Sequence, residues 1–299
     1  MDGLHDLKRR IKSTKNTRQM TRAMEAVSAT KMRHAVERAI SSRAYSHTIW
    51  NIVRELRSHD SSQQHPLLSV RQPRRSVGII ITSDRGLCGG FNTSVIRAFT
   101  QAITERESQG TEVEIIAVGK KGTIQLLRLN KTLTEAYEKW NDQPDIVGVR
   151  GLIAKLIQRY TKKEIDEVFI GYTDFRSALR QVARVRRMFP IGLDPIEFQT
   201  DRNAATAYAN GESFQEFLFE PSRETVLELL LPRLLEVELF QLLLESSASE
   251  HSSRMMTMRN ATNNAQDMIN ELTLTYNQVR QAAITQEIAE IAAGRAALE

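Results

Sequence analysis

Two long stretches of this chain have a helical pattern of hydrophobic and polar positions. Residues 4–65 and 233–293 contain neither Gly nor Pro, so each can form a helix of roughly 90 Å at a rise of ~1.5 Å per residue. Small or apolar residues recur three or four positions apart in both stretches. The two series are Leu4, Leu7, Ile11, Thr14, Thr17, Met20, Met24 and Val27, and then Met258, Ala261, Ala265, Met268, Leu272, Tyr276, Val279 and Ala283. Such narrow seams predict an antiparallel coiled coil.

Between these stretches the pattern changes to strands that alternate with helices. Val77–Thr82 is a continuous β-branched run, typical of a strand that is buried on both faces. Further strands are predicted at 113–118, 168–172 and 182–189, and helices at 94–107, 120–129 and 147–160. This alternation predicts a small, doubly wound, Rossmann-like α/β domain enclosed by the two long helices.

Proline positions suggest the boundaries of these parts. The sequence PLLSVRQPRR at 66–75 ends the first helix, and a polar return segment at 198–212 leads to a second helical arm that begins within 214–228. Pro232 lies inside the apolar part of that arm and predicts a kink or a break. We therefore expect a helix at 1–65, an α/β domain at 74–200 and a helix at 212–299.

The net charge of +5 is unevenly spread along the chain. Residues 1–59 hold 13 Lys and Arg against 5 Asp and Glu, whereas residues 212–299 hold 6 Arg against 14 Asp and Glu. A basic arm alone would indicate nucleic-acid binding. An equally acidic arm in the same chain predicts instead that the two arms lie against each other.

The composition argues against several classes of protein. Cys88 is the single cysteine, so no internal disulfide is expected, and the six histidines are scattered without a pair at i, i+4 beside a carboxylate. We therefore expect no metal and no cofactor. No apolar run approaches the ~20 residues that span a bilayer, and the charged N-terminus lacks the apolar stretch of a secretory signal.

One stretch has a position that suits chemistry. Ser83–Asn92 (SDRGLCGGFN) follows a strand and precedes a helix, where phosphate-binding loops lie. However, no Lys-Ser/Thr pair follows its glycines, and their spacing departs from G-x-G-x-x-G. We expect a tight structural loop without a nucleotide, in which Asp84 and Arg85 are free to face a partner.

A basic group surrounds the last predicted strand. Its members are Arg176, Arg180, Arg184, Arg186 and Arg187. In a strand, Arg184 and Arg186 share one face, which nucleic acid or an acidic protein could bind. Charge that protects an exposed edge strand is an equally good explanation. The sequence contains no G-x-S-x-G motif and no convincing Cys/His dyad, so we do not expect an enzyme.

Three motifs together resemble one family. Residues 7–29 (LKRRIKSTKNTRQMTRAMEAVSA) resemble the opening helix of the γ subunit of F-type ATP synthase. Ser83–Asn92 is similar to that family's central-domain loop, and residues 280–291 (RQAAITQEIAEI) are similar to its C-terminal signature. With residues 245–256 (ESSASEHSSRMM), these motifs occur in the right order over the whole chain.

The resemblance implies a rotor that carries no catalytic residues. In this family the paired terminal helices form an asymmetric shaft inside a ring of three α and three β subunits. The central domain sits beside ε and the membrane ring of c subunits, and rotation couples proton flow through the c ring to ATP synthesis on the β subunits. The missing import peptide favours a bacterial chain, peripheral at the cytoplasmic face of the cell membrane. It would touch the membrane only through the c ring.

The resemblance also assigns two sets of contact residues by position. Met24, Arg254, Gln281, Thr285 and Glu287 match contacts with the ring of α and β subunits. Phe217, Leu218, Phe219, Glu220 and Pro221 match the foot that faces the c ring and ε. The alternative is a structural coiled-coil adaptor that binds nucleic acid or an acidic protein through its basic helix. The acidic C-terminal arm argues against nucleic acid.

Overall fold

The computed structural model describes residues 2–57, 65–141, 144, 146–192, 220 and 222–296. The chain divides into two compact units. The α/β unit is Thr30–Ser253, and the paired-helix unit consists of Met1–Ala29 and Arg254–Glu299. Helices α1 (Asp2–Arg57) and α6 (Arg223–Ala296) contribute residues to both units.

The α/β unit is built around a five-stranded sheet in the order β3-β2-β1-β4-β5. The strands are β1 (Arg75–Ile81), β2 (Glu112–Val118), β3 (Leu133–Tyr137), β4 (Glu167–Ser177) and β5 (Arg180–Phe189). The first four are parallel, and β5 runs antiparallel to β4. The other elements are the short 3-10 helix η2 (Pro66–Leu68) and the helices α2 (Phe91–Ser108), α3 (Lys120–Arg128) and α4 (Ile146–Thr161). The predicted Rossmann-like α/β domain is confirmed.

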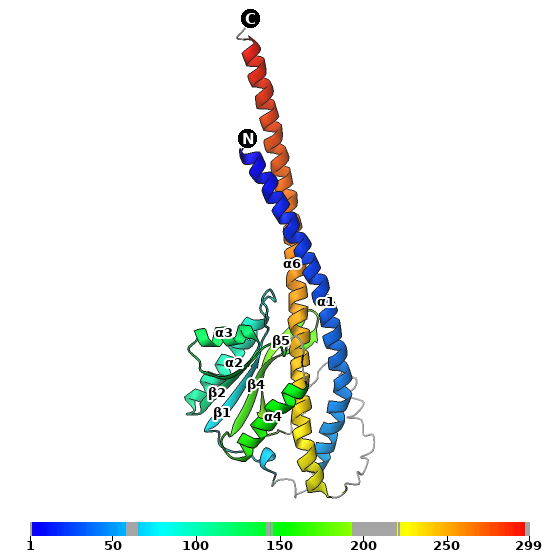
Figure 1. Ribbon diagram of the computed structural model, residues 1–299, viewed down its shortest axis with the longest axis vertical. Helices are drawn as coiled ribbons and strands as arrows, with labels where there is room; N and C mark the ends of the chain where they lie inside the picture. The colour runs from blue at the N-terminus through cyan, green and yellow to red at the C-terminus, as the bar shows by residue number, and fades with distance from the viewer. Residues whose placement is uncertain are drawn as a thin grey trace. The chain divides into compact units, whose positions relative to one another are not determined.

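Helices cover both faces of this sheet. α2 and α3 lie on one face, and α4 and the first part of α6 lie on the other (Figure 1). Successive β1 residues point into different cores: Ile79 joins the cluster that contains α4 and α6, whereas Ile80 joins the cluster that contains α2. Burial on both faces explains the continuous β-branched run that the sequence shows at this strand.

The sequence pattern missed β3. Its residues, LTEAY, alternate between half-buried and exposed positions at one edge of the sheet, and Thr134 is the only β-branched residue among them. A short, polar edge strand has little hydrophobic signal. The strand β3 therefore forms because its backbone pairs with β2, and its own composition gives little indication of a strand.

Phe99 of α2 is seated in the sheet by two glycines. A Cβ atom added at Gly78 of β1 or at Gly171 of β4 would come within 2.8 Å of the Phe99 ring. The ring also lies 5.5 Å, centroid to centroid, from that of Phe169. The absence of two side chains thus lets an aromatic ring approach the sheet closely and fill the core under α2.

Of the kink or break expected at Pro232, the break is wrong, because α6 runs through this residue as one helix, and the kink stays a prediction. Proline removes one backbone hydrogen bond and crowds the preceding turn, at a cost of roughly 3 kcal/mol. The flanking leucines offset that cost. Leu227, Leu231, Leu234, Leu235 and Leu239 are all buried in the core with α4 and the sheet. The predicted segments at 198–212 and 214–219 lie outside the described residues.

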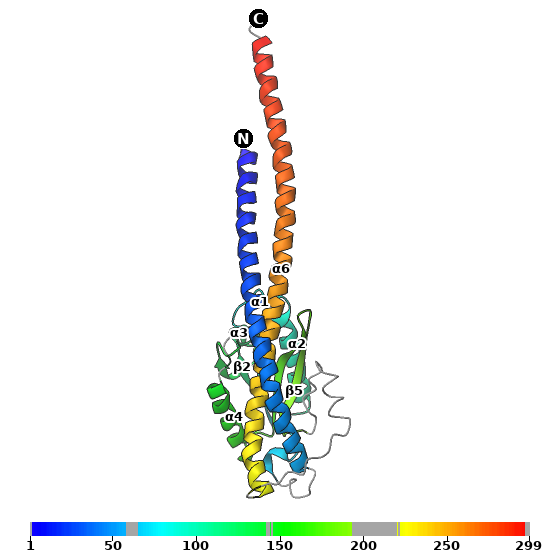
Figure 2. The same cartoon turned by 90° about the vertical axis from the view of Figure 1, so that its right-hand side faces the viewer.

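In the paired-helix unit the two helices lie side by side and antiparallel, as predicted (Figures 1 and 2). Three side-chain contacts set the register: Thr21 Oγ1 to Thr262 Oγ1 at 2.7 Å, Arg18 Nη1 to Gln266 Oε1, and Thr14 Oγ1 to Met268 Sδ at 3.9 Å. Numbers on α6 fall as those on α1 rise, so the start of α1 lies level with about residue 280 of α6.

The predicted seam of the first helix is right as far as Thr14 and then slips by one position. Met20 and Val27 are 66% and 58% exposed, whereas Thr21 is half-buried and Ser28 is buried. The regular alternation of three and four residues continues through polar side chains, which bond across the interface. Of the apolar residues that the expectation placed in this part of the seam, Met24 is half-buried, whereas Met20 and Val27 lie on the outer surface.

The same slip occurs once on α6. Ile269 is buried, whereas Met268, which the pattern placed in the seam, is 53% exposed. Ala265 and Met258 are buried as expected. Both helices therefore keep a heptad spacing, with small and polar residues at several of the interface positions.

Opposite charge does not explain this pairing, although the pairing itself was predicted correctly. The part of α6 level with α1, residues 254–280, holds three Arg against one Asp and one Glu. On α1, Arg9 and Arg10 both pair with Asp6 of their own helix. Most acidic residues of the C-terminal arm precede residue 254 and so belong to the α/β unit.

Candidate functional site

The last part of α6 is a single helix within the paired-helix unit. Both views show α6 continuing beyond the N-terminal end of α1 (Figures 1 and 2). Residues 281–291 are exposed apart from half-buried Ala283. Three of the assigned contact residues, Gln281, Thr285 and Glu287, lie on this projecting segment. The Thr285 hydroxyl donates to the Gln281 carbonyl at 2.9 Å, so it is bonded to its own helix.

Three isoleucines on the same segment were not among the predicted contact residues. Ile284, Ile288 and Ile291 are 47%, 63% and 73% exposed and are spaced four and three residues apart. That spacing places them along one face of the helix. In the sequence, apolar residues at helical spacing that continue past the end of the partner helix were the signal that could have identified these isoleucines as candidate contact residues.

The other two assigned ring contacts lie apart from this segment. Met24 is half-buried on α1, and Arg254 is 7% exposed at the start of the α6 part of this unit. The register of the pair places Met24 level with about residue 259 of α6. The five assigned residues are therefore spread along the paired-helix unit and do not form one cluster.

Most of the assigned foot lies outside the described residues. Phe217, Leu218, Phe219 and Pro221 are among the residues that the structure does not describe. Glu220 is described and is exposed. It precedes the first turn of α6, where the Ser222 hydroxyl accepts from the Thr225 amide at 3.2 Å.

The sequence suggested that Asp84 is free to face a partner, but both of its carboxylate oxygens are bonded within the α/β unit. One carboxylate oxygen accepts from the Lys120 amide at 3.1 Å, and the other accepts from the Lys139 amide at 3.0 Å. Asp84 thus satisfies an amide at the start of α3 and ties the loop after β3 to the loop after β1. Its role in the α/β unit is structural.

The rest of the loop at 83–92 is also closed on itself. The Asn92 side chain accepts from the Ser83 amide at 3.0 Å and donates to the Ser83 hydroxyl at 2.7 Å. Leu87 and Gly89 adopt positive φ, which turns the backbone sharply ahead of α2. The buried Cys88 packs inside this turn. The expectation that the loop binds no nucleotide stays a prediction.

The arginines around β5 are engaged mainly within the α/β unit. Asp174 of β4 pairs with Arg176 at 2.7 Å and with Arg184 at 3.3 Å, and Arg186 pairs with Glu238 of α6 at 3.2 Å. β5 is an edge strand of the sheet, at the opposite side from β3. These contacts favour the protected-edge explanation over a nucleic-acid surface.

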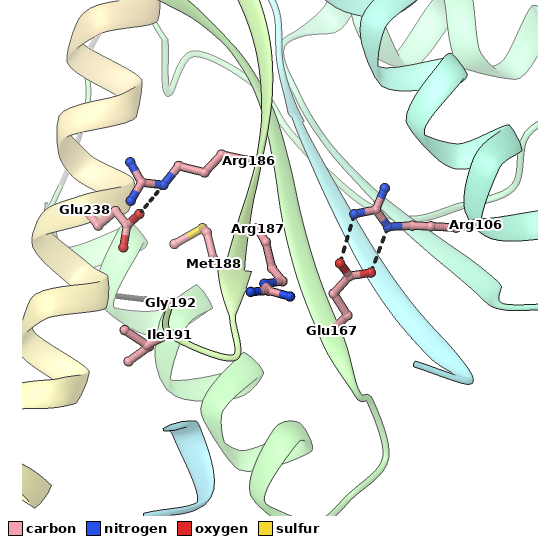
Figure 3. A pocket seen from close by; sticks show the side chains of 8 residues that line it. All are labelled: Arg106, Glu167, Arg186, Arg187, Met188, Ile191, Gly192 and Glu238. Carbon is pink, nitrogen blue, oxygen red and sulfur yellow. Dashed lines mark hydrogen bonds and ion pairs between the residues drawn. The ribbon is translucent and has the colours of Figure 1, made fainter. Parts of the chain in front are cut away.

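A cavity of about 290 Å³ opens beside this edge strand (Figure 3). It is lined by Arg106, Glu167, Arg186, Arg187, Met188, Ile191, Gly192 and Glu238. Two Arg–Glu pairs lie in its wall, because Arg106 also holds Glu167 through two bonds of 2.7 and 2.9 Å. Burial raises the pKa of the Glu238 carboxyl above its ordinary 4.5, although the adjacent Arg186 acts in the opposite direction. Two of the three arginines in the wall are therefore paired with carboxylates.

No helix among the residues that the structure describes has an apolar stretch long enough to cross a membrane. In the same parts of the chain, no cluster of three or more His, Cys, Asp and Glu is arranged to hold a metal ion.

Comparison with known sequences covers almost the whole chain. The family model described as ATP synthase matches residues 3–298. The chain is 42% identical to the ATP synthase gamma chain of Herpetosiphon aurantiacus, over 100% of this chain and 99% of that one. It is 41% identical to the ATP synthase gamma chain of Pelotomaculum thermopropionicum, over the full length of both.

Solved structures share the fold. A chain of the Euglena gracilis mitochondrial ATP synthase (OSCP/F1/c-ring, rotational state 3) aligns with a TM-score of 0.65 at 18% identity, over 99% of this chain and 95% of that one. A chain of the central stalk and c-ring structure of the Tetrahymena thermophila mitochondrial ATP synthase aligns with a TM-score of 0.59 at 22% identity, over 81% of this chain and 99% of that one.

Proposed function

The chain belongs to the ATP synthase family, among its gamma chains, and we propose that it is the non-catalytic central-stalk rotor of an F1Fo ATP synthase. In this role it couples proton flow through the membrane c ring to ATP synthesis at the β subunits by turning inside the ring of three α and three β subunits. The full-length match to gamma chains at 42% identity is the observation that carries this proposal. The antiparallel helix pair with a projecting end supports it, because a rotor needs an asymmetric axle.

We assign the upper contacts of this rotor to the paired-helix unit. Gln281, Thr285 and Glu287 would meet the ring of α and β subunits on the exposed end of α6, and Met24 and Arg254 would meet it farther along the pair. The exposure of residues 281–291 supports this, since a helix without an intramolecular partner has its surface available to other subunits. The exposed isoleucine stripe supplies apolar area for such contacts.

The lower contacts are assigned to the foot. Residues 217–221 (FLFEP) would face the c ring and ε, and the exposure of Glu220 is consistent with that position. Along the chain, the proposed division is a coiled-coil helix at 1–65, a central α/β domain at 74–200 and a second coiled-coil helix at 212–299.

The chain is part of a membrane-associated F1Fo complex. We place it peripherally at the cytoplasmic face of a bacterial cell membrane, which it would touch only through the c ring. The bacterial gamma chains at 41–42% identity support this placement. No nucleic acid is involved in this role.

Reversible cross-links in the assembled complex test the rotor directly. Thr285→Cys would be joined to a cysteine on β, and Glu220→Cys to a cysteine on the c ring, each in a Cys88→Ser background. Cys88 is buried, and the Ser253 hydroxyl bonds its backbone carbonyl, so that bond survives the replacement. The link to β should stop multi-site ATP hydrolysis until a reductant is added, because the catalytic sites exchange states only as the axle turns past them.

The link at the foot should leave hydrolysis and coupled proton pumping largely intact, since the c ring and the rotor move together. Complexes that carry one cysteine of each pair are the matched controls. Full-rate hydrolysis with the β link verified as complete would refute the rotor. In addition, the isolated chain should bind ATP more weakly than about 100 μM, equivalent to roughly 5.5 kcal/mol, as measured by calorimetry.

A further inference from the structure

The β4–β5 hairpin extends beyond the part of the sheet that β1 covers. The pairing of β1 with β4 ends at Ile80 and Gly171, whereas β4 continues to Ser177. Thr173 lies in this extension. Its amide donates to the Ser246 hydroxyl at 3.1 Å, and its carbonyl accepts from the Ser249 hydroxyl at 3.2 Å. Two serines of α6 therefore take the backbone bonds that a neighbouring strand would make.

Two more serines on the same stretch of α6 repeat the arrangement. The Ser252 hydroxyl donates to the carbonyl of Ala178, at the turn of the hairpin, at 2.7 Å and accepts from the Gln181 side chain at 3.3 Å. The Ser253 hydroxyl donates to the Cys88 carbonyl, in the loop before α2, at 2.6 Å. Ser252 and Ser253 lie three and four residues after Ser249, which itself lies three residues after Ser246, so the four hydroxyls are on one side of the helix.

We call Ser246, Ser249, Ser252 and Ser253 the serine ladder. The first three are completely buried, as is Ala248 between them. Earlier in α6, residues 227–243 bury leucines in the core that α4 and the sheet share. The helix thus meets the α/β fold first through large apolar side chains and then through small hydroxyls bonded to backbone atoms.

The apolar contacts hold α6 against the α/β fold, whereas the hydroxyl bonds fix its orientation there. Apolar burial is strong but non-directional, so it holds the helix without setting its rotation closely. A hydroxyl bond to a backbone atom contributes only about 1 kcal/mol but has a narrow range of distance and angle. Four such bonds reach three separate segments, namely β4, the hairpin turn and the loop at 83–92.

We propose that the serine ladder sets the rotational register of the β4–β5 hairpin on α6 and so makes the α/β unit a stiff part of the rotor. This inference rests on the proposed function. A load applied to the α/β unit would pass into α6 partly through these bonds. Without them the leucine core still holds the helix, but the hairpin twists more freely about it. The four serines are positioning residues for torque transfer.

The test uses the assembled complex fixed to a surface through its β subunits. A rod attached to Ser108→Cys, an exposed residue at the end of α2, reports the angle of the α/β unit. Cys88 stays unlabelled because it is buried. The triple variant Ser246→Ala, Ser249→Ala, Ser252→Ala should raise the angular variance of the rod during a catalytic pause by about twofold, because three directional bonds to the backbone are lost. The maximum rate of ATP hydrolysis should change little.

Thr273→Ala with Thr275→Ala is the matched control, because these exposed α6 hydroxyls bond only carbonyls of their own helix in the described contacts. An unchanged variance in the triple variant, or an equal rise in the control, would overturn the proposal. If the triple variant does not assemble, the single variants Ser249→Ala and Ser252→Ala should each give a smaller rise by the same measurement.

A second measurement does not depend on rotation. In the isolated chain, Ser246→Ala should speed hydrogen exchange at the Thr173 amide, whereas Thr275→Ala should not. Unchanged exchange at the Thr173 amide would show that its bond to the Ser246 hydroxyl is not formed and would overturn the proposal. A complex with intact serines that fails to rotate at all would instead contradict the rotor function.

Discussion

The two units of this chain differ in the contacts that stabilise each of them internally. The α/β unit has two apolar cores, one on each face of its sheet, and buries Phe99, Phe169 and Tyr160. The paired-helix unit has a narrow seam in which Ala265 and Ile269 alternate with hydroxyls and amides. The α/β unit buries most of its large apolar side chains, whereas in the paired-helix unit the exposed ones outnumber the buried ones. That contrast suits a folded body and an axle that other subunits surround.

The largest effect should follow from removing the ring at the centre of the α/β unit. Phe99→Ala should lower the free energy of unfolding by about 3–5 kcal/mol, because the ring is fully buried between two glycines and the sheet cannot close over the gap. Urea unfolding of the isolated chain measures this loss. Leu274→Ala, which truncates a residue that is 61% exposed in the paired-helix unit, should change it by no more than about 0.5 kcal/mol. Similar losses for the two variants would contradict the contrast between the units.

A seam variant should loosen one unit without the other. Ile269→Ala should cost the paired helices about 2 kcal/mol, the low end for such a truncation, because their narrow seam leaves the site close to solvent. Hydrogen exchange should rise at 2–29 and 254–280 and stay unchanged in the strands of the sheet. Met268→Ala, at the neighbouring exposed position, is the matched control. Faster exchange throughout the sheet would show that the units do not open separately.

The buried carboxyl of the α/β unit should make its stability depend on pH. Burial raises the pKa of Glu238, so the folded chain binds more protons than the unfolded chain at pH values between the ordinary 4.5 and the raised value. Stability from this group is complete below that window and is lost as pH rises through it. The free energy of unfolding should therefore fall with rising pH in the unmodified chain relative to Glu238→Gln.

Urea unfolding of both chains over a series of pH values gives that difference. Glu271→Gln, on an exposed face of the paired-helix unit, is the matched control. A difference that grows in favour of the unmodified chain as pH rises would mean that the ion pair with Arg186 outweighs burial.

The smallest effect is expected at the hydroxyl pair in the seam. Thr21→Val or Thr262→Val alone should cost about 1 kcal/mol, because each removes the 2.7 Å contact across the seam and leaves the other hydroxyl bonded only to a carbonyl of its own helix. The double variant should cost less than the two single costs combined, since both ends of the bond are then apolar. A double-mutant cycle by thermal unfolding measures the coupling. Simple additivity would show that the two hydroxyls do not depend on each other.

Much of the fold could be predicted because its signals are local. The run at Val77–Thr82 and the long stretches without Gly or Pro each indicate an element within a few residues of its end. The effect of Pro232 on its helix could not be predicted from such local signals. Whether a proline ends a helix depends on how much the flanking leucines bury, and that depends on the sheet beneath them.

The contact surfaces were harder to predict than the elements. Asp84 reads as an exposed loop residue, but its carboxylate bonds two amides that are 36 and 55 residues away in sequence. Ile284, Ile288 and Ile291 follow the spacing of a seam, but their partner helix ends before them. In both cases the missing information is which segment lies opposite.

The sequence by itself determined the order of the elements, the antiparallel helix pair and the family, because periodicity and motifs are written along the chain. Only the tertiary structure decided which residues of the helices face each other. A heptad can be continued through Met20 or through Thr21, and the choice depends on the hydroxyl of Thr262 across the interface. The tertiary structure likewise decided that the serines of α6 complete the edge of β4. The sequence alone does not show which backbone atom a serine hydroxyl will bond, because that depends on which segment the fold brings within reach.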